Sequence, residues 1–159
     1  MNGGLVPLFM LSATLGLMLS FAPNRLTTLG LLGFAAAALL AFLVPLGLSP
    51  TVIFVGLWAS VIAIAALVYL PAARWSAAII PLCIYAGFCM GAYATLSNNW
   101  PGLALGLLPA LLGFPAKWLI CNKFDIVIKV VASWMIAIAS LSMFVSLMPT
   151  PGYKPDHME

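Results

Sequence analysis

The sequence predicts an all-α, polytopic membrane protein, and three observations point to this class. Of its 159 residues, 65% are apolar and only 6% are charged, whereas a soluble domain carries about 25% charged residues. The apolar residues gather in six runs, each near the ~20 residues that a helix needs to cross the hydrocarbon core of a bilayer. Turn-forming residues separate the runs. The chain therefore has too few polar side chains to cover a water-soluble domain, and a lipid bilayer is its expected partner.

The six expected helices have short connections. They span residues 5–22, 27–46, 51–70, 76–96, 103–120 and 126–148 of one transmembrane domain, residues 1–149, and residues 150–159 form a short polar tail. Ser49 followed by Pro50 is typical of an N-cap with proline at the first helical position. Asp125 is placed to cap the last helix, and Lys129 follows it in the favourable order for a local ion pair.

Five of the six lysines and arginines lie in or beside alternate connections and the sixth, Lys154, lies in the tail, which predicts an orientation. Arg25, Arg74, Lys117, Lys123 and Lys129 all lie in or beside the first, third or fifth connection. The second and fourth connections carry no charge. Because cytoplasmic loops are enriched in Lys and Arg, we expect the odd connections in the cytoplasm and both termini in the extracytoplasmic space. The membrane we expect is the bacterial inner (plasma) membrane.

The fourth run carries small residues at steps of four: Cys83, Gly87, Gly91 and Thr95. On a helix these residues share one face, and the GxxxG pair within them makes a shallow groove. A groove of this kind lets a neighbouring backbone approach closely. We therefore expect the four residues to be helix-packing positions.

The two halves of the chain contain similar stretches, which suggests a 3+3 inverted repeat. Residues 62–67 (IAIAAL) recur as residues 136–141 (IAIASL), and Trp58 recurs as Trp134 at nearly the same offset. Three helices per half is an odd number, so the second half would be inverted relative to the first, as in many transporters. The alternative is a chance match between apolar sequences drawn from few residue types.

The fifth run is interrupted by proline and glycine. Its candidate path or packing residues are Gly106, Pro109, Gly113, Pro115 and Lys117. Each internal proline removes a backbone donor to the carbonyl four residues earlier, and lipid offers no replacement. Discontinuous helices of this kind line the binding sites of many small transporters. The alternatives are a kinked helix that only packs and a lysine that extends to the interface.

The sequence shows no catalytic or cofactor-binding constellation. The single histidine, His157, lies in the tail, so neither an axial-histidine haem nor an imidazole metal site is expected in the membrane. Cys83 and Cys89 do not share a helix face. No carboxylate lies inside a span, which argues against a proton relay and against acid–base catalysis. We expect no enzyme activity, cofactor or metal, and the net charge of +3 is too small to predict nucleic-acid binding.

Two functions fit these features. The first is transport of a small neutral or weakly anionic solute along a path beside the fifth helix. The second is a non-catalytic subunit or assembly partner of a larger membrane complex, bound to other subunits or to a second copy of the chain. A path requires that the carbonyls of Leu105 and Leu111, released by the two prolines, face a cavity. A structural partner would bury them against other helices.

Overall fold

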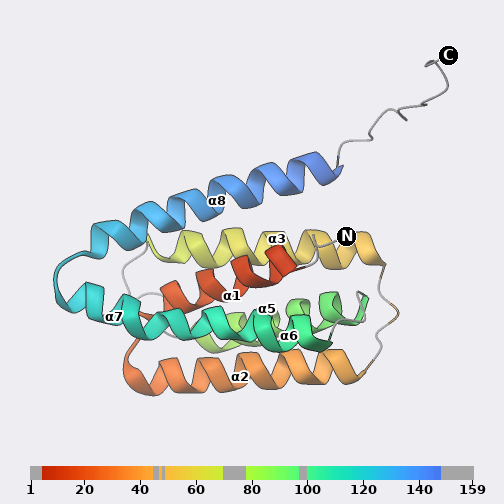
Figure 1. The fold of residues 1–159 in the computed structure, drawn as a ribbon, viewed down its shortest axis with the longest axis horizontal. Helices are drawn as coiled ribbons and strands as arrows, with labels where there is room; N and C mark the ends of the chain where they lie inside the picture. Colours follow the sequence, from red (N-terminus) through yellow and green to blue (C-terminus); the bar gives the residue numbers. More distant parts are fainter. Residues whose placement is uncertain (1–4, 45–46, 48, 70–77, 97–99, 148–159) are drawn as a thin grey trace, which may run out of the picture.

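Helices account for almost all of the chain in the computed structural model (Figure 1). The structure describes residues 5–44, 47, 49–69, 78–96 and 100–147, and no strand occurs in these residues. In chain order the elements are α1 (Leu5–Leu19), α2 (Asn24–Leu43), α3 (Pro50–Leu67), α5 (Ile79–Leu96), α6 (Trp100–Leu107), the 3-10 helix η3 (Leu108–Leu112), α7 (Gly113–Cys121) and α8 (Asp125–Leu147). The all-α class expected from composition is confirmed.

Each of the six expected spans corresponds to one helical stretch. Five are long and apolar enough to cross a membrane: Asn24–Leu43, Pro50–Leu67, Ile79–Leu96, Pro101–Cys121 and Ile126–Val145. The sixth is α1, which is apolar but has only 15 residues. Its regular helix ends at Leu19, and turn hydrogen bonds such as Ala22 N–H to Leu19 O (3.1 Å) continue to the first connection. The chain thus folds as a helical membrane bundle.

The two helix starts predicted from the sequence are found at the expected residues. α3 begins at Pro50 with Ser49 at its N-cap, although the Ser49 side chain makes no capping hydrogen bond. α8 begins at Asp125. The Asp125 side chain lies outside the described part of the structure, so its ion pair with Lys129 stays a prediction.

The helices run alternately between two ends of the bundle (Figure 1). We call the end where α1 begins the N-terminal end, and α8 finishes at this same end. The opposite end carries Arg25, Lys117, Lys123 and Lys129, and we call it the cationic end. The third connection with Arg74 and the tail, residues 150–159, lie outside the described residues. The cations that are described thus gather at one end, as the charge pattern predicts, and its cytoplasmic orientation stays a prediction.

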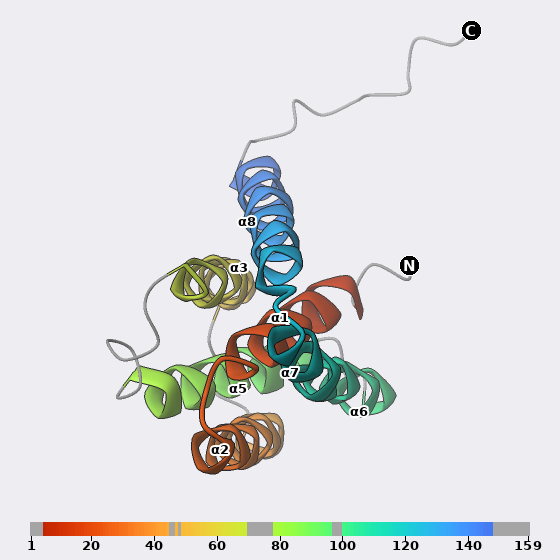
Figure 2. The same cartoon turned by 90° about the vertical axis from the view of Figure 1, so that its left-hand side faces the viewer.

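α1 lies in the middle of the bundle (Figures 1 and 2), although the sequence drew attention to the fourth span. It contacts every other described helix, and Leu8, Leu11 and Leu15 are fully buried. The buried Ser12 hydroxyl donates to the carbonyl of Leu8 at 2.9 Å, and Thr14 bonds one turn back in the same way. These polar side chains are therefore satisfied within the helix.

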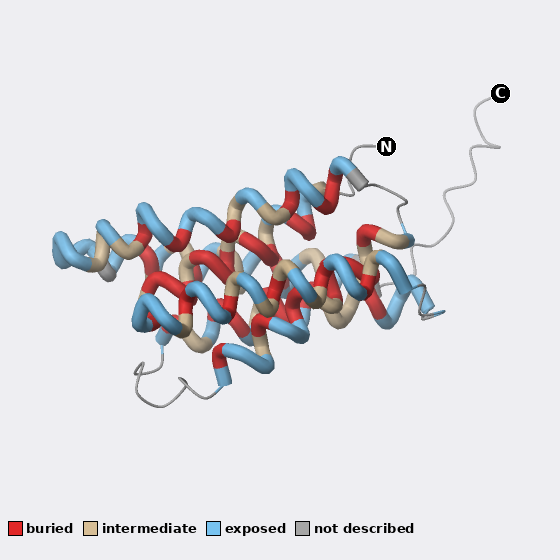
Figure 3. The backbone as a smooth tube through the Cα atoms, turned by 90° about the horizontal axis from the view of Figure 1, so that it is seen from below, coloured by how far each residue is buried: buried red, intermediate tan, exposed pale blue. Residues whose placement is uncertain are grey.

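The other helices differ in how deeply they pack against this centre. The most extensive contact in the bundle joins α2 to α5. α8 packs mainly on α3 and stands at the outside of the bundle in the end view (Figure 2). Buried positions form inward stripes along the helices and exposed positions face outward (Figure 3). In a bilayer those outward apolar positions face lipid.

The packing gives one observation against the expected repeat and one in its favour. Trp58 is 3% exposed whereas Trp134 is 70% exposed, so the two tryptophans occupy different environments. Helix pairing is more symmetric, because α2 packs against α5 while α6, η3 and α7 pack against α1. In both cases the second span of one half contacts the first span of the other half. The inverted repeat stays a prediction.

Candidate functional site

The fifth span is divided into three pieces around Pro109, and Pro115 lies in the first turn of the third piece. α6 ends at Leu107, the 3-10 helix η3 holds Pro109, and α7 resumes at Gly113. Hydrogen bonds in a 3-10 helix join residues three apart, instead of the four of an α-helix. The hydrogen-bond spacing therefore changes from four residues to three in the piece that holds Pro109, which has no N–H to donate. The N–H of Gly113 donates to the carbonyl of Ala110, three residues earlier. The Leu111 carbonyl lies near the same N–H, but a contact two residues back in helical geometry is too bent for a good hydrogen bond.

Gly16 of α1 lies directly against this break. A Cβ added to Gly16 would be 2.7 Å from the Ala110 carbonyl oxygen and 3.1 Å from that of Pro109. A Cβ added to Gly113 would be 2.8 Å from the Gly16 carbonyl oxygen. Because the two backbones meet, only glycine fits at both positions. The centre of the break is therefore closed by protein.

The remaining candidates in this span lie on different sides of it. Gly106 faces the interior, where its nearest neighbours are the Met90 methyl group and Leu8. Pro109 is half-buried and Pro115 is exposed. The structure therefore brings Gly113 and Lys117 together at one cavity, and it does not bring Gly106 or Pro115 to that cavity.

This cavity lies at the cationic end, between the start of α2 and α7. Its volume is about 320 Å³. Its lining residues come from both helices and are mostly polar on the α2 side: Asn24, Thr27, Thr28, Gly113, Phe114 and Lys117. We call it the Lys117 cavity. It adjoins the closed contact with Gly16, because Gly113 belongs to both.

Lys117 contributes the only charged side chain of this cavity. Its Nζ donates to Asn24 Oδ1 at 2.6 Å and to Thr27 Oγ1 at 3.4 Å. Both acceptors are neutral, and the side chains that the structure describes include no carboxylate. Among the described side chains, the half-buried ammonium is thus held by oxygen dipoles alone. A small anion entering the cavity would supply a negative charge through charge-assisted hydrogen bonds.

Thr27 fixes the geometry of this cluster. Its hydroxyl approaches the carbonyl oxygens of Leu19 at 3.2 Å, Ala22 at 3.4 Å and Pro23 at 3.2 Å. The hydroxyl has one proton to donate and lone pairs to accept with. It therefore donates to the backbone where α1 and α2 meet and accepts from Lys117, which ties the lysine to the first turn of α2.

The sequence analysis did not identify the α2 residues of this cavity. It placed Asn24 in a connection and began the second helix at residue 27, whereas α2 begins at Asn24 with Pro23 at its N-cap. The available signal was the spacing of Asn24, Thr27 and Thr28. Residues three and four apart share a helix face, so these polar side chains form one patch at the start of a helix that is apolar after Thr28.

The small-residue stripe of the fourth span faces α2. A Cβ added to Gly87 would overlap the Phe34 carbonyl oxygen, and one added to Gly91 would overlap that of Ala38. Cys83 lies next to Gly30. At the end of the stripe, Thr95 Oγ1 lies 3.3 Å from the carbonyl oxygen of Ala41 and 2.9 Å from that of Gly91. The stripe thus lies at the contact between two helix backbones.

The described residues contain no cluster suited to a metal ion. No group of three His, Cys, Asp or Glu side chains comes together within them. Cys83 and Cys89 are buried and Cys121 is exposed, all as free thiols. His157 lies outside the part of the chain that the structure describes.

Comparison with known proteins gives no relative for this chain, since no family model, no curated protein and no solved structure matches it. Its function is therefore argued from the residues described above.

Proposed function

We propose that this integral membrane protein is of transport type and passes a small, weakly anionic solute along a path beside the interrupted fifth span. The observation that carries the proposal is the Lys117 ammonium, which contacts only neutral oxygens in a cavity next to the break. A charge within a membrane-spanning segment is costly and typically marks an ion or substrate pathway. The unbalanced charge favours an anion over a neutral solute.

The first step of the path is capture at the cationic end. Arg25 and Lys123 lie at the same end of the bundle, and positive charge there raises the local concentration of anions. In the cavity, the Lys117 ammonium and the Asn24 amide offer hydrogen-bond donors, whereas the Thr28 hydroxyl donates to the carbonyls of Asn24 and Arg25. These donors would replace part of the water that a small anion loses on leaving the solvent.

The second step is passage through the constriction. Above the Lys117 cavity, the contact between Gly16 and η3 closes the path. The 3-10 geometry of η3 gives weaker hydrogen bonds than an α-helix, so this piece changes its register more readily than α6 or α7. We propose that a shift of η3 away from Gly16 opens the path.

Flux through the purified protein in liposomes tests this function. The solutes are formate, nitrate and glycerol, and the variants are Lys117→Gln and the control Lys129→Gln. Lys129 lies at the same end but does not line the cavity, so its substitution removes the same surface charge. We expect formate or nitrate flux above that of protein-free liposomes, a loss of about tenfold in Lys117→Gln, as for one charge-assisted hydrogen bond, and little change in Lys129→Gln.

Two results would contradict the proposal. The first is flux no greater than in protein-free liposomes for all three solutes with correctly folded protein. The second is an equal loss in both lysine variants, because this would show that general surface charge, and not the cavity, determines the rate.

A second candidate function is a non-catalytic subunit of a larger complex, and the position of α8 favours it. Only 17% of its membrane-spanning residues are buried, compared with 50% for α5. Trp134 and Leu141 are 70% and 65% exposed. Cysteines introduced at these two positions would cross-link to a protein neighbour in the native membrane if α8 is an assembly face. Cross-linking together with absent flux would favour this function.

A further inference from the structure

The lining of the Lys117 cavity combines buried residues with residues at the outside of the bundle. Thr27 and Gly113 are buried, and the contact between Gly113 and Gly16 closes the way toward the bundle centre. Thr28 and Phe114, in contrast, are exposed. Exposed side chains of a helix in the bilayer face lipid. The cavity is therefore accessible from the side, where lipid molecules surround the protein.

Two side chains of this cavity keep hydrogen-bond donors for a ligand. An ammonium has three protons, and Lys117 Nζ directs two of them to Asn24 Oδ1 and Thr27 Oγ1, so the third has no acceptor among the described residues. Asn24 accepts through Oδ1, and no described residue accepts from its Nδ2 group. Because Nζ lies 2.6 Å from Oδ1 of the same amide, one ligand can accept from both groups.

The position of the cavity along the helices determines its depth in the membrane. α2 has 20 residues, so at 1.5 Å per residue it is roughly 30 Å long, which is about the thickness of the hydrocarbon core. Asn24 is the first residue of α2, and Lys117 lies about one turn before the end of α7 at Cys121. Both donors therefore lie near the edge of the hydrocarbon core. The headgroup region of the bilayer, which contains the lipid phosphates, begins at this edge.

Exposed apolar side chains continue from the cavity toward the middle of both spans. Leu32 follows Thr28 by one turn on the same face of α2 and is 67% exposed. On the fifth span, Phe114 and Leu111 are 58% and 51% exposed. The surface beside the cavity therefore suits hydrocarbon chains that begin at a positively charged site. A small inorganic anion would use only the charged part of this arrangement.

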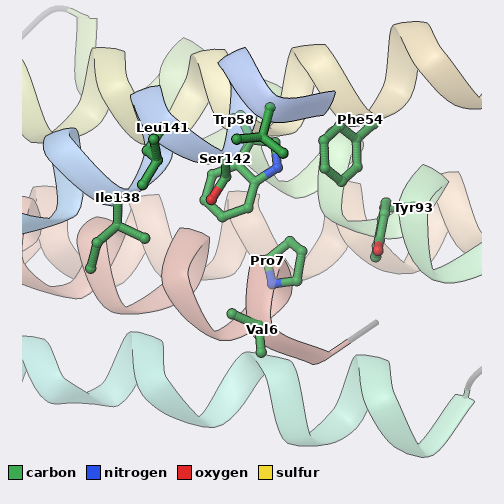
Figure 4. A pocket seen from close by; sticks show the side chains of 9 residues that line it. Val6, Pro7, Phe54, Trp58, Tyr93, Ile138, Leu141 and Ser142 are labelled. Atoms are coloured by element: carbon green, nitrogen blue, oxygen red, sulfur yellow. The ribbon is translucent and has the colours of Figure 1, made fainter. Parts of the chain in front are cut away.

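A larger cavity between α1, α3, α5 and α8 offers no partner for a charge (Figure 4). Its volume is about 480 Å³, and all the residues that line it are neutral, with Ser142 adding one hydroxyl to aromatic and aliphatic side chains. An anionic group there would lose its hydration without a compensating charge, which is costly. Of these two cavities, only the Lys117 cavity therefore suits an anion.

We propose that the Lys117 cavity binds the phosphate group of an anionic membrane lipid of the phosphatidylglycerol type. Lys117 Nζ and Asn24 Nδ2 donate hydrogen bonds to the phosphate oxygens, and the acyl chains lie along Phe114 and Leu32. Basic pockets between membrane-spanning helices bind anionic headgroups in this way. A zwitterionic headgroup fits less well, because its own cation is repelled by Lys117 and by Arg25, which follows Asn24 in the chain. The lipid would compete with a small anion for Lys117, but its binding does not rest on the proposed transport function.

Native mass spectrometry of the purified protein in a nonionic detergent tests the proposal. The probes are dioleoylphosphatidylglycerol and dioleoylphosphatidylcholine, which have the same chains and different headgroups. We expect the unmodified chain to bind the first lipid more tightly than the second. Binding of the phosphatidylglycerol should weaken about tenfold in Lys117→Gln, as for one charge-assisted hydrogen bond, and change little in Lys129→Gln. Equal binding of the two lipids by the unmodified chain, or an equal loss in the two variants, would overturn the proposal.

A pair of neutral substitutions distinguishes the cavity from general surface charge. Asn24→Ala removes the amide that contacts Lys117, whereas the control Asn122→Ala removes an exposed amide at the same end, which donates to the Trp118 carbonyl. Neither substitution changes the net charge. We expect phosphatidylglycerol to bind about threefold more weakly to Asn24→Ala, as for one neutral hydrogen bond, and unchanged to Asn122→Ala. Unchanged binding to Asn24→Ala would overturn the proposal, and this comparison decides it if Lys117→Gln does not fold.

A third measurement distinguishes a lipid phosphate from a free one. Inorganic phosphate and glycerol 3-phosphate carry the anion without acyl chains, and a ligand of the folded state raises the midpoint of thermal denaturation. We expect phosphatidylglycerol to raise the midpoint of the unmodified chain in detergent but not that of Lys117→Gln. Neither soluble phosphate should raise it at the same concentration. If the soluble phosphates raise it as much as the lipid does, the occupant is a free oxyanion and the proposal is overturned. These measurements involve no flux, so failure of lipid binding and failure of transport are distinguishable.

Discussion

Lys123 shows how one residue ends a helix without the glycine that such a position favours. It is the one non-glycine residue with a positive φ, 64°, in the described chain. The Phe124 N–H donates to Leu119 O at 3.0 Å, and the Lys123 N–H donates to Ile120 O at 3.0 Å. This pair of bonds is the Schellman motif, in which glycine is the usual residue at the left-handed position.

Lys123→Gly is therefore expected to stabilise the protein. A left-handed conformation costs an L-residue roughly 1–2 kcal/mol, and part of this returns as the greater flexibility of glycine in the unfolded chain. We expect a net gain of about 0.5–1 kcal/mol, measured by denaturation in mild detergent. The control is Lys123→Ala, which removes the same charge but keeps a Cβ. An equal gain in the control would show that charge, and not backbone conformation, is responsible.

At the scale of elements, the contact between α2 and α5 depends on two glycines. The Gly87 and Gly91 positions leave no room for a Cβ next to the α2 carbonyls, whereas a Cβ at Gly33 would be 3.5 Å from Ile84 Cγ1, an ordinary contact. Replacing glycine by alanine at position 87 and at position 33 therefore distinguishes an effect on helix packing from an effect on helix propensity.

Gly87→Ala is expected to lower the free energy of unfolding by about 1–3 kcal/mol, as for an overfilled core contact. Gly33→Ala should hold or raise it, because alanine is preferred to glycine in a helix by up to about 1 kcal/mol. Denaturation in detergent measures both. Equal stability of the two variants would mean that α2 and α5 move apart without cost, so that close backbone contact is not what joins them.

The interrupted span provides the element-scale test between the two functions. Replacing Pro109 and Pro115 by leucine restores two backbone donors and favours a continuous α-helix. If η3 serves a path, stability should hold or rise while solute flux falls. If the span only packs, the new register would disturb the contact with Gly16 and lower stability by about 1–3 kcal/mol. Flux in liposomes and denaturation in detergent distinguish these outcomes.

At the scale of the whole molecule, the charge distribution predicts orientation in the membrane. Arg25 lies at the cationic end, where α2 begins. Cysteines introduced at Asn2 and Tyr153, which lie outside the described residues, should react with an impermeant maleimide in intact cells. A cysteine at position 25 should react only after the membrane is permeabilised. The native exposed Cys121 is first replaced by serine. The reverse labelling pattern would overturn the orientation and place Lys117 at the outer face.

Composition and local sequence determined the class, the approximate spans and the interruption of the fifth helix. These features depend on transfer of side chains to lipid and on the missing proline donor, which act within a single segment. The same local signals explain why Ser49 and Pro50 mark the start of α3 and why the cations gather at one end. Lys117 was identified from the sequence because it is a charged residue within an apolar, proline-interrupted segment. Its partners Asn24 and Thr27 were not, because they meet it only after α2 and α7 have packed together.

The central place of α1, the burial of Trp58 and the exposure of Trp134 were decided by the tertiary structure alone. In a soluble helix, the contrast between apolar and polar faces tells which side turns inward. In lipid both sides are apolar, so hydrophobicity does not distinguish the core face from the lipid face. Close backbone approach then decides the arrangement, as where Gly16 meets Gly113. Such complementarity is a property of two segments together, and neither sequence contains it alone.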